Sequence, residues 1–144
     1  THQGATWTAD AYQQLKNVPY PSTPDNVKSL VAASTSSEVK SMLTSYGNQR
    51  WNAAVIEIKI KAVADWAQRN NVAIICNEFG AYKPYSPVAA RAQYIQDVRT
   101  IFEKYQIGWA MWECDATFGL LCYPGTARTD FYVDSSIKGA LGLK

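Results

Sequence analysis

The sequence predicts an α/β fold, in which short strands alternate with amphipathic helices. Two observations support this prediction. Two short, almost wholly apolar runs, at residues 72–76 and 107–112, lie on either side of a segment with helical periodicity. That segment is long enough to form the crossover that a parallel pair of strands requires. Runs this short and this apolar are typical of strands that are buried on both faces.

The part of the chain before residue 72 is expected to contain a loop and three helices. Residues 1–22 show no sustained period and are expected to form the loop. The first helix begins at Thr23-Pro24-Asp25, which combines a capping residue, a first-turn proline and an acid. The second begins at the capping-box pattern of residues 35–38 and ends near Gly47. The third runs from about 52 to 69 and has an apolar stripe, formed by Ile56, Ile60, Val63 and Ala67 with Val55 and Trp66 beside it.

The strand at 72–76 is followed directly by Asn77-Glu78-Phe79-Gly80. Ser86-Pro87 is expected to start the next helix, which runs to about Tyr105. A short helix at 135–141 follows the second strand. The sequence has no internal repeat and no low-complexity linker, which predicts one domain over residues 1–144. The inner face of the helix between the strands is expected to hold Ile95, Val98, Phe102 and Tyr105.

Two parallel strands are too few to form a stable sheet that is covered on both faces. The predicted helices would cover far more sheet than this chain supplies, so the pattern indicates part of an α/β barrel, from its late elements to its end. Catalytic groups of such barrels lie at the carboxyl ends of the strands. Glu78 is predicted to lie at that edge.

Composition excludes several classes of protein. Hydrophobic residues make up 47% of the 144 residues and charged residues 18%, as in an ordinary globular domain. No apolar stretch approaches transmembrane length, and the polar start of the chain is not a signal peptide. The net charge of +2, without a Lys/Arg cluster, argues against nucleic acid as a partner. His2 is the only histidine and no phosphate-binding loop is present, so we expect neither a metal nor another cofactor.

The three cysteines leave the cellular location open. Cys114 and Cys122 are close enough in sequence to form a small disulfide across a loop, which would indicate an oxidising compartment and secretion. Cys76 lies inside the first strand and is expected to be a buried thiol. A cytosolic protein with three free thiols would fit almost as well.

Three segments resemble the family-five glycoside hydrolases, which are cellulase-like, eight-stranded α/β barrels. Val72 to Tyr82, which includes Asn77-Glu78-Phe79-Gly80, is similar to the seventh strand of that family with its nucleophile motif. Gly108-Trp109-Ala110-Met111-Trp112-Glu113, followed by Phe118-Gly119-Leu120, is similar to the eighth strand and its loop. Residues 1–7 are similar to the stretch just after the sixth strand.

The resemblance implies the C-terminal part of a (β/α)8 barrel, from the end of strand six to helix eight, as a single partial catalytic domain. It implies a retaining endoglucanase that acts on β-1,4-linked glucan. The Asn-Glu pair of the fourth strand, which supplies the acid/base in this family, is absent from these residues. That carboxylate would come from an N-terminal barrel part, a separate chain or a second copy of this chain.

Glu78 is the expected nucleophile, by the motif and by its position at the strand end. The alternative is a Glu that caps a helix or forms a salt bridge. Trp112 matches the tryptophan that provides a platform for the sugar, and the alternative is a core residue. Trp109 has the opposite parity and is expected to pack against a helix.

Other candidates have weaker support. If Trp112 faces the barrel axis, alternation turns Glu113 toward the helices or the rim, so it is not the expected acid unless a bulge reverses the parity. Asp115 lies in the following loop, where a cap or turn role is expected. His2 and Trp7 could line an outer sugar subsite, or they could equally have no fixed position near the chain end.

Two other functions fit the same residues. A non-catalytic carbohydrate-binding protein would use Trp112, Trp7 and the tyrosine-rich loops as stacking surfaces, because the five Trp and nine Tyr exceed what the core requires. An inactive barrel fragment would keep the scaffold alone.

Overall fold

The computed structural model describes residues 15–144, so His2 and Trp7 lie outside the described residues. Two helices come first, α1 (Pro24–Ala33) and α2 (Ser37–Asn48), and they pack against each other. Thr23 caps α1 as predicted, since its hydroxyl accepts from the Asn26 backbone N–H while the Asn26 side chain accepts from the Thr23 N–H. The cap of α2 is Ser36, one residue later than the predicted pattern.

Helix α3 (Ala53–Asn70) has the predicted limits. Asn52 caps its start, and Asn71 ends it in the left-handed conformation at φ 52°. Ile56 and Ala67 are buried, but Val63 is 52% exposed and Trp66 is 51% exposed. The predicted apolar stripe is therefore covered only in part by the described residues.

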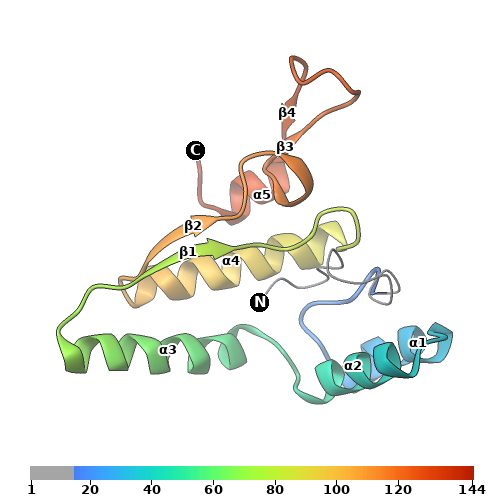
Figure 1. Cartoon of the computed structure of the whole chain (residues 1–144), viewed down its shortest axis with the longest axis horizontal. Coiled ribbons are helices and arrows are strands. Elements are labelled where there is room, and N and C mark those ends of the chain that lie inside the picture. Colours follow the sequence, from blue (N-terminus) through green and yellow to red (C-terminus); the bar gives the residue numbers. More distant parts are fainter. Residues whose placement is uncertain (1–14) are drawn as a thin grey trace.

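The two predicted strands form a parallel pair, β1 (Ile75–Phe79) and β2 (Gly108–Met111), and α4 (Val88–Lys104) is the crossover between them. Strand β1 begins three residues later than predicted and includes Glu78. Figure 1 shows the two strands side by side over α4. Helix α4 begins after Pro87, as predicted, but no side-chain hydrogen bond caps its start, so Ser86-Pro87 marks the start of the helix without capping it.

One face of this strand pair packs on the main core cluster. The inner side chains of α4 form its centre, as predicted for Ile95, Val98 and Phe102, and Ile56 and Ile137 join from the helices on either side. The Phe79 ring makes edge-to-face contacts with Phe102 and Trp109, at centroid distances of 5.6 and 5.8 Å. The predicted packing of Trp109 is confirmed.

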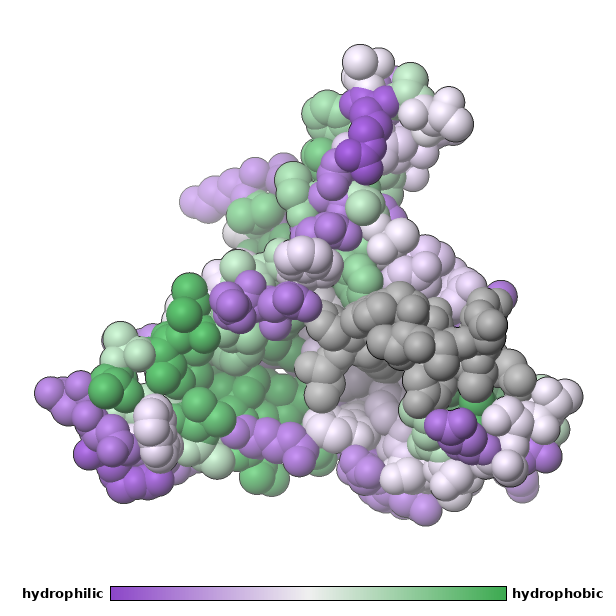
Figure 2. Space-filling model, in the orientation of Figure 1, coloured by the Kyte–Doolittle hydropathy of each residue, from purple (hydrophilic) through white to green (hydrophobic). Residues whose placement is uncertain are grey.

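The opposite face of the strand pair is open, which corrects the prediction of strands buried on both faces. Ile75 is 69% exposed, Gly108 and Ala110 are exposed, and Cys76 is only half-buried. The physical reason is that the described helices cover one face only. Figure 2 shows apolar side chains gathered on the surface over α3 and β1. The exposed large apolar residues of this region are Ile58, Val63, Trp66, Val72 and Ile75.

The end of the chain holds elements that the sequence did not predict. After β2 come a 3₁₀ turn, η2 (Ala116–Phe118), and a short antiparallel hairpin of β3 (Leu121–Cys122) and β4 (Tyr132–Val133). Helix α5 (Ser135–Ala140), which was predicted, follows and packs on α4. The hairpin projects beyond the helices (Figure 1).

The three cysteines are free thiols in the structure, so the proposed Cys114–Cys122 disulfide is not formed. Among residues 15–144, no helix combines the length and the apolar character that crossing a membrane requires.

Candidate active site

A hollow of about 470 Å³ lies at the carboxyl ends of β1 and β2. It brings together the two side chains that the sequence singled out, Glu78 and Trp112, and Glu113 lines it as well. Trp112 is 46% exposed among the described residues. The remaining lining residues are Tyr82, Thr117 and Phe118.

An irregularity in β1 directs Glu78 away from the core. Cys76 pairs with Trp109 and Phe79 pairs with Met111, so β1 has one residue more than β2 between these pairs. Such a bulge breaks the alternation of side chains along the strand. Phe79 consequently enters the core, whereas Asn77 and Glu78 are both exposed. The bulge lies in β1, beside the candidate nucleophile.

The ends of β1 and β2 approach each other so closely at Gly80 that a residue with a side chain would not fit there. The Phe79 carbonyl accepts from the Trp112 N–H at 2.8 Å, which holds the end of β1 against the end of β2. A Cβ atom on Gly80 would lie 2.3 Å from the Trp112 carbonyl oxygen, far inside van der Waals contact. Glycine at this position lets Glu78 and Trp112 share one hollow.

Glu113 lies at the rim of the hollow, one of the two places that alternation allowed. Its Oε1 accepts from the Phe118 backbone N–H at 3.3 Å, so this carboxylate holds the loop after β2. The peptide bond that joins Trp112 to Glu113 is cis.

Asp115 precedes η2 but makes no capping hydrogen bond, so of the two expected roles, cap or turn, the cap is wrong. Its Oδ2 accepts from the Tyr123 hydroxyl at 3.1 Å and pairs with Arg128 at 3.2 Å. These contacts tie the loop to the β3–β4 hairpin.

Sequence reasoning missed the aromatic side of the hollow. The Tyr82 ring contacts Phe118 edge to face at 5.4 Å and Tyr85 at 5.2 Å. The Tyr82 and Phe118 rings therefore line the same hollow as Glu78, and Tyr85 packs against Tyr82. The available signal was the excess of tyrosine near the Glu-Phe-Gly segment.

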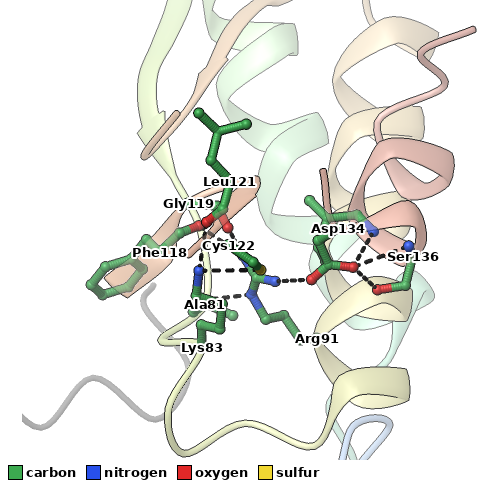
Figure 3. Close-up of polar contacts among 10 residues, drawn as sticks. Ala81, Lys83, Arg91, Phe118, Gly119, Leu121, Cys122, Asp134 and Ser136 are labelled. Carbon is green, nitrogen blue, oxygen red and sulfur yellow. Dashed lines mark hydrogen bonds and ion pairs between the residues drawn. The ribbon is translucent and has the colours of Figure 1, made fainter. Parts of the chain in front are cut away.

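Arg91, the most buried charged residue among those described, was also missed. It is 3% exposed, and its guanidinium donates to the carbonyls of Ala81, Phe118 and Gly119 at 3.2, 2.8 and 2.9 Å (Figure 3). Its fourth partner is Asp134, at 3.2 Å. Burial lowers the pKa of Arg91, and the Asp134 charge opposes that effect. The available signal was its place on the apolar face of α4, four residues before Ile95.

Asp134 connects this buried arginine to the start of α5. Its Oδ1 accepts from the Ser136 and Ile137 backbone N–H groups and from the Ser136 hydroxyl (Figure 3). Burial raises the pKa of Asp134, but these hydrogen bonds and the Arg91 charge bring it below its ordinary value. Within residues 15–144, no group of three or more His, Cys, Asp or Glu side chains could hold a metal ion.

Several known proteins are similar to this chain in sequence or in structure. No protein-family model matches it. Endoglucanase 3 of Fibrobacter succinogenes is 33% identical over 126 residues, which cover 84% of this chain and 19% of that protein. The cellulose synthase subunit Z of Clostridioides difficile is 31% identical, with a TM-score of 0.55 over 62% of this chain and 28% of that one. A hyperthermophilic endo-β-1,4-glucanase, solved with substrate, is 33% identical, with a TM-score of 0.55 over 62% and 27%.

A fourth neighbour is matched over a larger share of the chain. Endoglucanase Cel5A of Thermotoga maritima is 24% identical, with a TM-score of 0.61 over 98% of this chain and 35% of that enzyme. This chain therefore has the fold of one part of an α/β-barrel enzyme. The resemblance to the family-five glycoside hydrolases of the cellulase type is confirmed, and the chain corresponds to the C-terminal part of such enzymes.

Proposed function

We propose that this chain is the nucleophile-bearing part of a retaining glycoside hydrolase that acts on β-1,4-linked glucan. The observation that supports this most is the shared hollow of Glu78 and Trp112 at the carboxyl ends of two parallel strands. Glu78 attacks the anomeric carbon there, and the exposed Trp112 ring carries the sugar. The chain spans 19% of Endoglucanase 3, so the activity of the whole enzyme is part of this proposal.

The acid/base comes from outside the described residues. Retaining hydrolysis requires a second carboxylate roughly 5 Å from the first, and it must protonate the leaving oxygen. Glu113 is in the hollow but its Oε1 is bound to the Phe118 N–H, which suits a supporting role. An N-terminal barrel part, or a second copy of this chain, would supply the missing group.

The open face of the strand pair supports the proposal that another part of the protein packs against this chain. The face with Ile75, Gly108 and Ala110 is exposed, and α3 exposes Ile58, Val63 and Trp66. Exposed strand edges and apolar faces of this kind are normally covered by neighbouring strands or helices. In the complete protein, the remaining strands of a barrel would cover these exposed surfaces. Within that barrel, this chain would run from the end of strand six to helix eight.

The substrate class and the location follow from the relatives. The Fibrobacter succinogenes relative is named as an endoglucanase and the hyperthermophilic relative as an endo-β-1,4-glucanase, which favours a β-1,4-glucan. Secretion is proposed because such a polymer is met outside the cell. His2 and Trp7, which lie outside the described residues, stay predicted residues of an outer sugar subsite.

The nucleophile can be tested without the acid/base, because a substrate with an activated leaving group needs no protonation to depart. The chain is incubated with 2,4-dinitrophenyl 2-deoxy-2-fluoro-β-cellobioside and digested for mass spectrometry. We expect a covalent glycosyl group on the peptide that contains Glu78. Glu78→Gln should not be labelled. Glu57→Gln, on α3 and paired with Lys104 outside the hollow, is the control and should be labelled normally. A folded chain labelled elsewhere, or not at all, would contradict the proposal.

Hydrolysis of a soluble β-1,4-glucan then tests the missing group. We expect no turnover by the isolated chain when an N-terminal barrel part is the source of the acid/base. Turnover that Glu78→Gln abolishes would mean that Glu113, Asp115 or a second copy supplies the acid.

A second candidate function is carbohydrate binding without catalysis. It is favoured by the aromatic side of the hollow, where Tyr82 and Phe118 line the same space as the carboxylate and Trp112 is 46% exposed. Such a protein would bind cellotetraose with equal affinity before and after Glu78→Gln and would never form the covalent adduct. Trp112→Ala should abolish binding.

A further inference from the structure

We propose that Arg91 is a positioning residue that fixes the loop after β2 and thereby sets the shape of the hollow and the place of Glu113. This inference rests on the proposed function. The Arg91 side chain is 3% exposed, and a charge buried to this degree is tolerated only when its donors are hydrogen-bonded. All four of its contacts go to groups outside α4, where it originates.

These contacts join three segments that are far apart in sequence. One acceptor is Ala81, directly after the β1 end, and two are Phe118 and Gly119, in the loop after β2. The fourth is Asp134, at the start of α5. The planar guanidinium can hold several acceptors in fixed directions, which a lysine cannot. Figure 3 shows the guanidinium between these groups.

The link to the hollow runs through the backbone of Phe118. Arg91 donates to the Phe118 carbonyl at 2.8 Å, while the Phe118 N–H donates to Glu113 Oε1 at 3.3 Å. Displacement of Phe118 would therefore move Glu113, and it would also move the ring that contacts Tyr82. Phe118, Glu113 and Tyr82 all line the hollow.

Lys83 makes a second connection between the segment after β1 and the loop after β2. Its backbone N–H donates to the Thr117 carbonyl at 2.8 Å, and its Nζ donates to the Leu121 carbonyl at 2.9 Å. These two bonds lie on either side of Phe118, whereas Arg91 binds the Phe118 carbonyl itself. Loss of Arg91 should hence loosen the Phe118 side of the hollow without freeing the whole loop.

The test compares two arginines of the same helix. Arg91→Lys keeps the positive charge but replaces the planar guanidinium and its five N–H donors by a single ammonium group. Arg99→Lys is the matched control, because Arg99 also donates to a carbonyl, that of Ala140 in α5, but its partners Ala140 and Glu103 lie outside the loop after β2. Two quantities are measured: the affinity for cellotetraose by tryptophan fluorescence, and the amide hydrogen exchange of residues 113–121 by mass spectrometry.

We expect Arg91→Lys to weaken cellotetraose binding roughly tenfold, as small misplacements in a site do, and to accelerate exchange at 113–121. Arg99→Lys should leave both within about twofold, even if it lowers the melting temperature. Unchanged exchange and affinity in a folded Arg91→Lys would overturn the proposal.

Two further outcomes are separated by the design. If the unsubstituted chain fails to bind cellotetraose, the proposed function fails, and the exchange comparison alone decides the role of Arg91. If Arg91→Lys does not fold, the neutral pair Arg91→Gln/Asp134→Asn removes both charges of the ion pair together. That variant should show the same accelerated exchange, and protected amides at 113–121 would refute the positioning role.

Discussion

Replacing Gly80 by alanine tests the close approach that holds the two strand ends together. The added Cβ would lie 2.3 Å from the Trp112 carbonyl oxygen, whereas real Cβ contacts are essentially never shorter than 3.0 Å. One strand end must therefore move by about 0.7 Å, the difference between these two distances. The Phe118 ring, 3.4 Å from the same Cβ, restricts the directions that are available.

The expected cost is that of overpacking a backbone contact, about 1–3 kcal/mol of the free energy of unfolding. For a domain of this size, such a loss lowers the melting temperature by roughly 3–12 °C. The displacement also reaches the ring of Trp112, so the tryptophan emission of the folded protein should shift. Thermal unfolding by circular dichroism and the emission spectrum at 25 °C measure the two effects.

The control is Gly139→Ala, in α5, where nothing lies within 4 Å of the position that the added Cβ would take. Alanine should stabilise this helix by up to about 1 kcal/mol, because glycine is the poorer helix former. A Gly80→Ala protein with an unchanged melting temperature and emission spectrum would refute the argument that glycine is required at the strand end.

Two further predictions concern the core and the response to acid. Phe102→Ala should lower the free energy of unfolding by about 3–5 kcal/mol in urea titrations, because the ring is 8% exposed and contacts Phe79; a loss below about 1 kcal/mol would contradict the described core. The lowered pKa of Asp134 means that its contribution to stability is present above its unfolded pKa of about 3.9 and is lost as the pH falls through the lower folded value. Between about pH 5 and 2, the melting temperature of Asp134→Asn should therefore fall less than that of the unsubstituted chain. Parallel pH profiles of the two melting temperatures would exclude this role.

Much of the fold could be predicted because its signals are local. Thr23 and Asn52 begin helices through capping, and Asn71 ends one in the left-handed conformation. The period of Ile95, Val98 and Phe102 identified the buried side of α4. The lengths of the apolar runs and of the crossover predicted the parallel strand pair.

What could not be predicted depends on contacts between distant residues. Nothing in the residues near Glu78 indicates a bulge, because its evidence is a mismatch in pairing with β2. The exposure of Val63 and Trp66 depends on which neighbours are present to cover α3. The partners of Arg91 are mostly backbone carbonyls, which have no signature in a sequence.

The extra residue in β1 has a consequence for how this site can vary. The bulge lets Cys76 and Phe79 both turn toward the covered side, and Glu78 toward the open side, although three residue steps, an odd number, separate Cys76 from Phe79. A substitution at Asn77 preserves the bulge, whereas removal of Asn77 would restore one-to-one pairing and place Glu78 directly opposite Ala110 in a regular ladder, out of the bulge. Chain length at this point is thus under a tighter geometric constraint than side-chain chemistry, and insertions or deletions there should be tolerated far less than replacements.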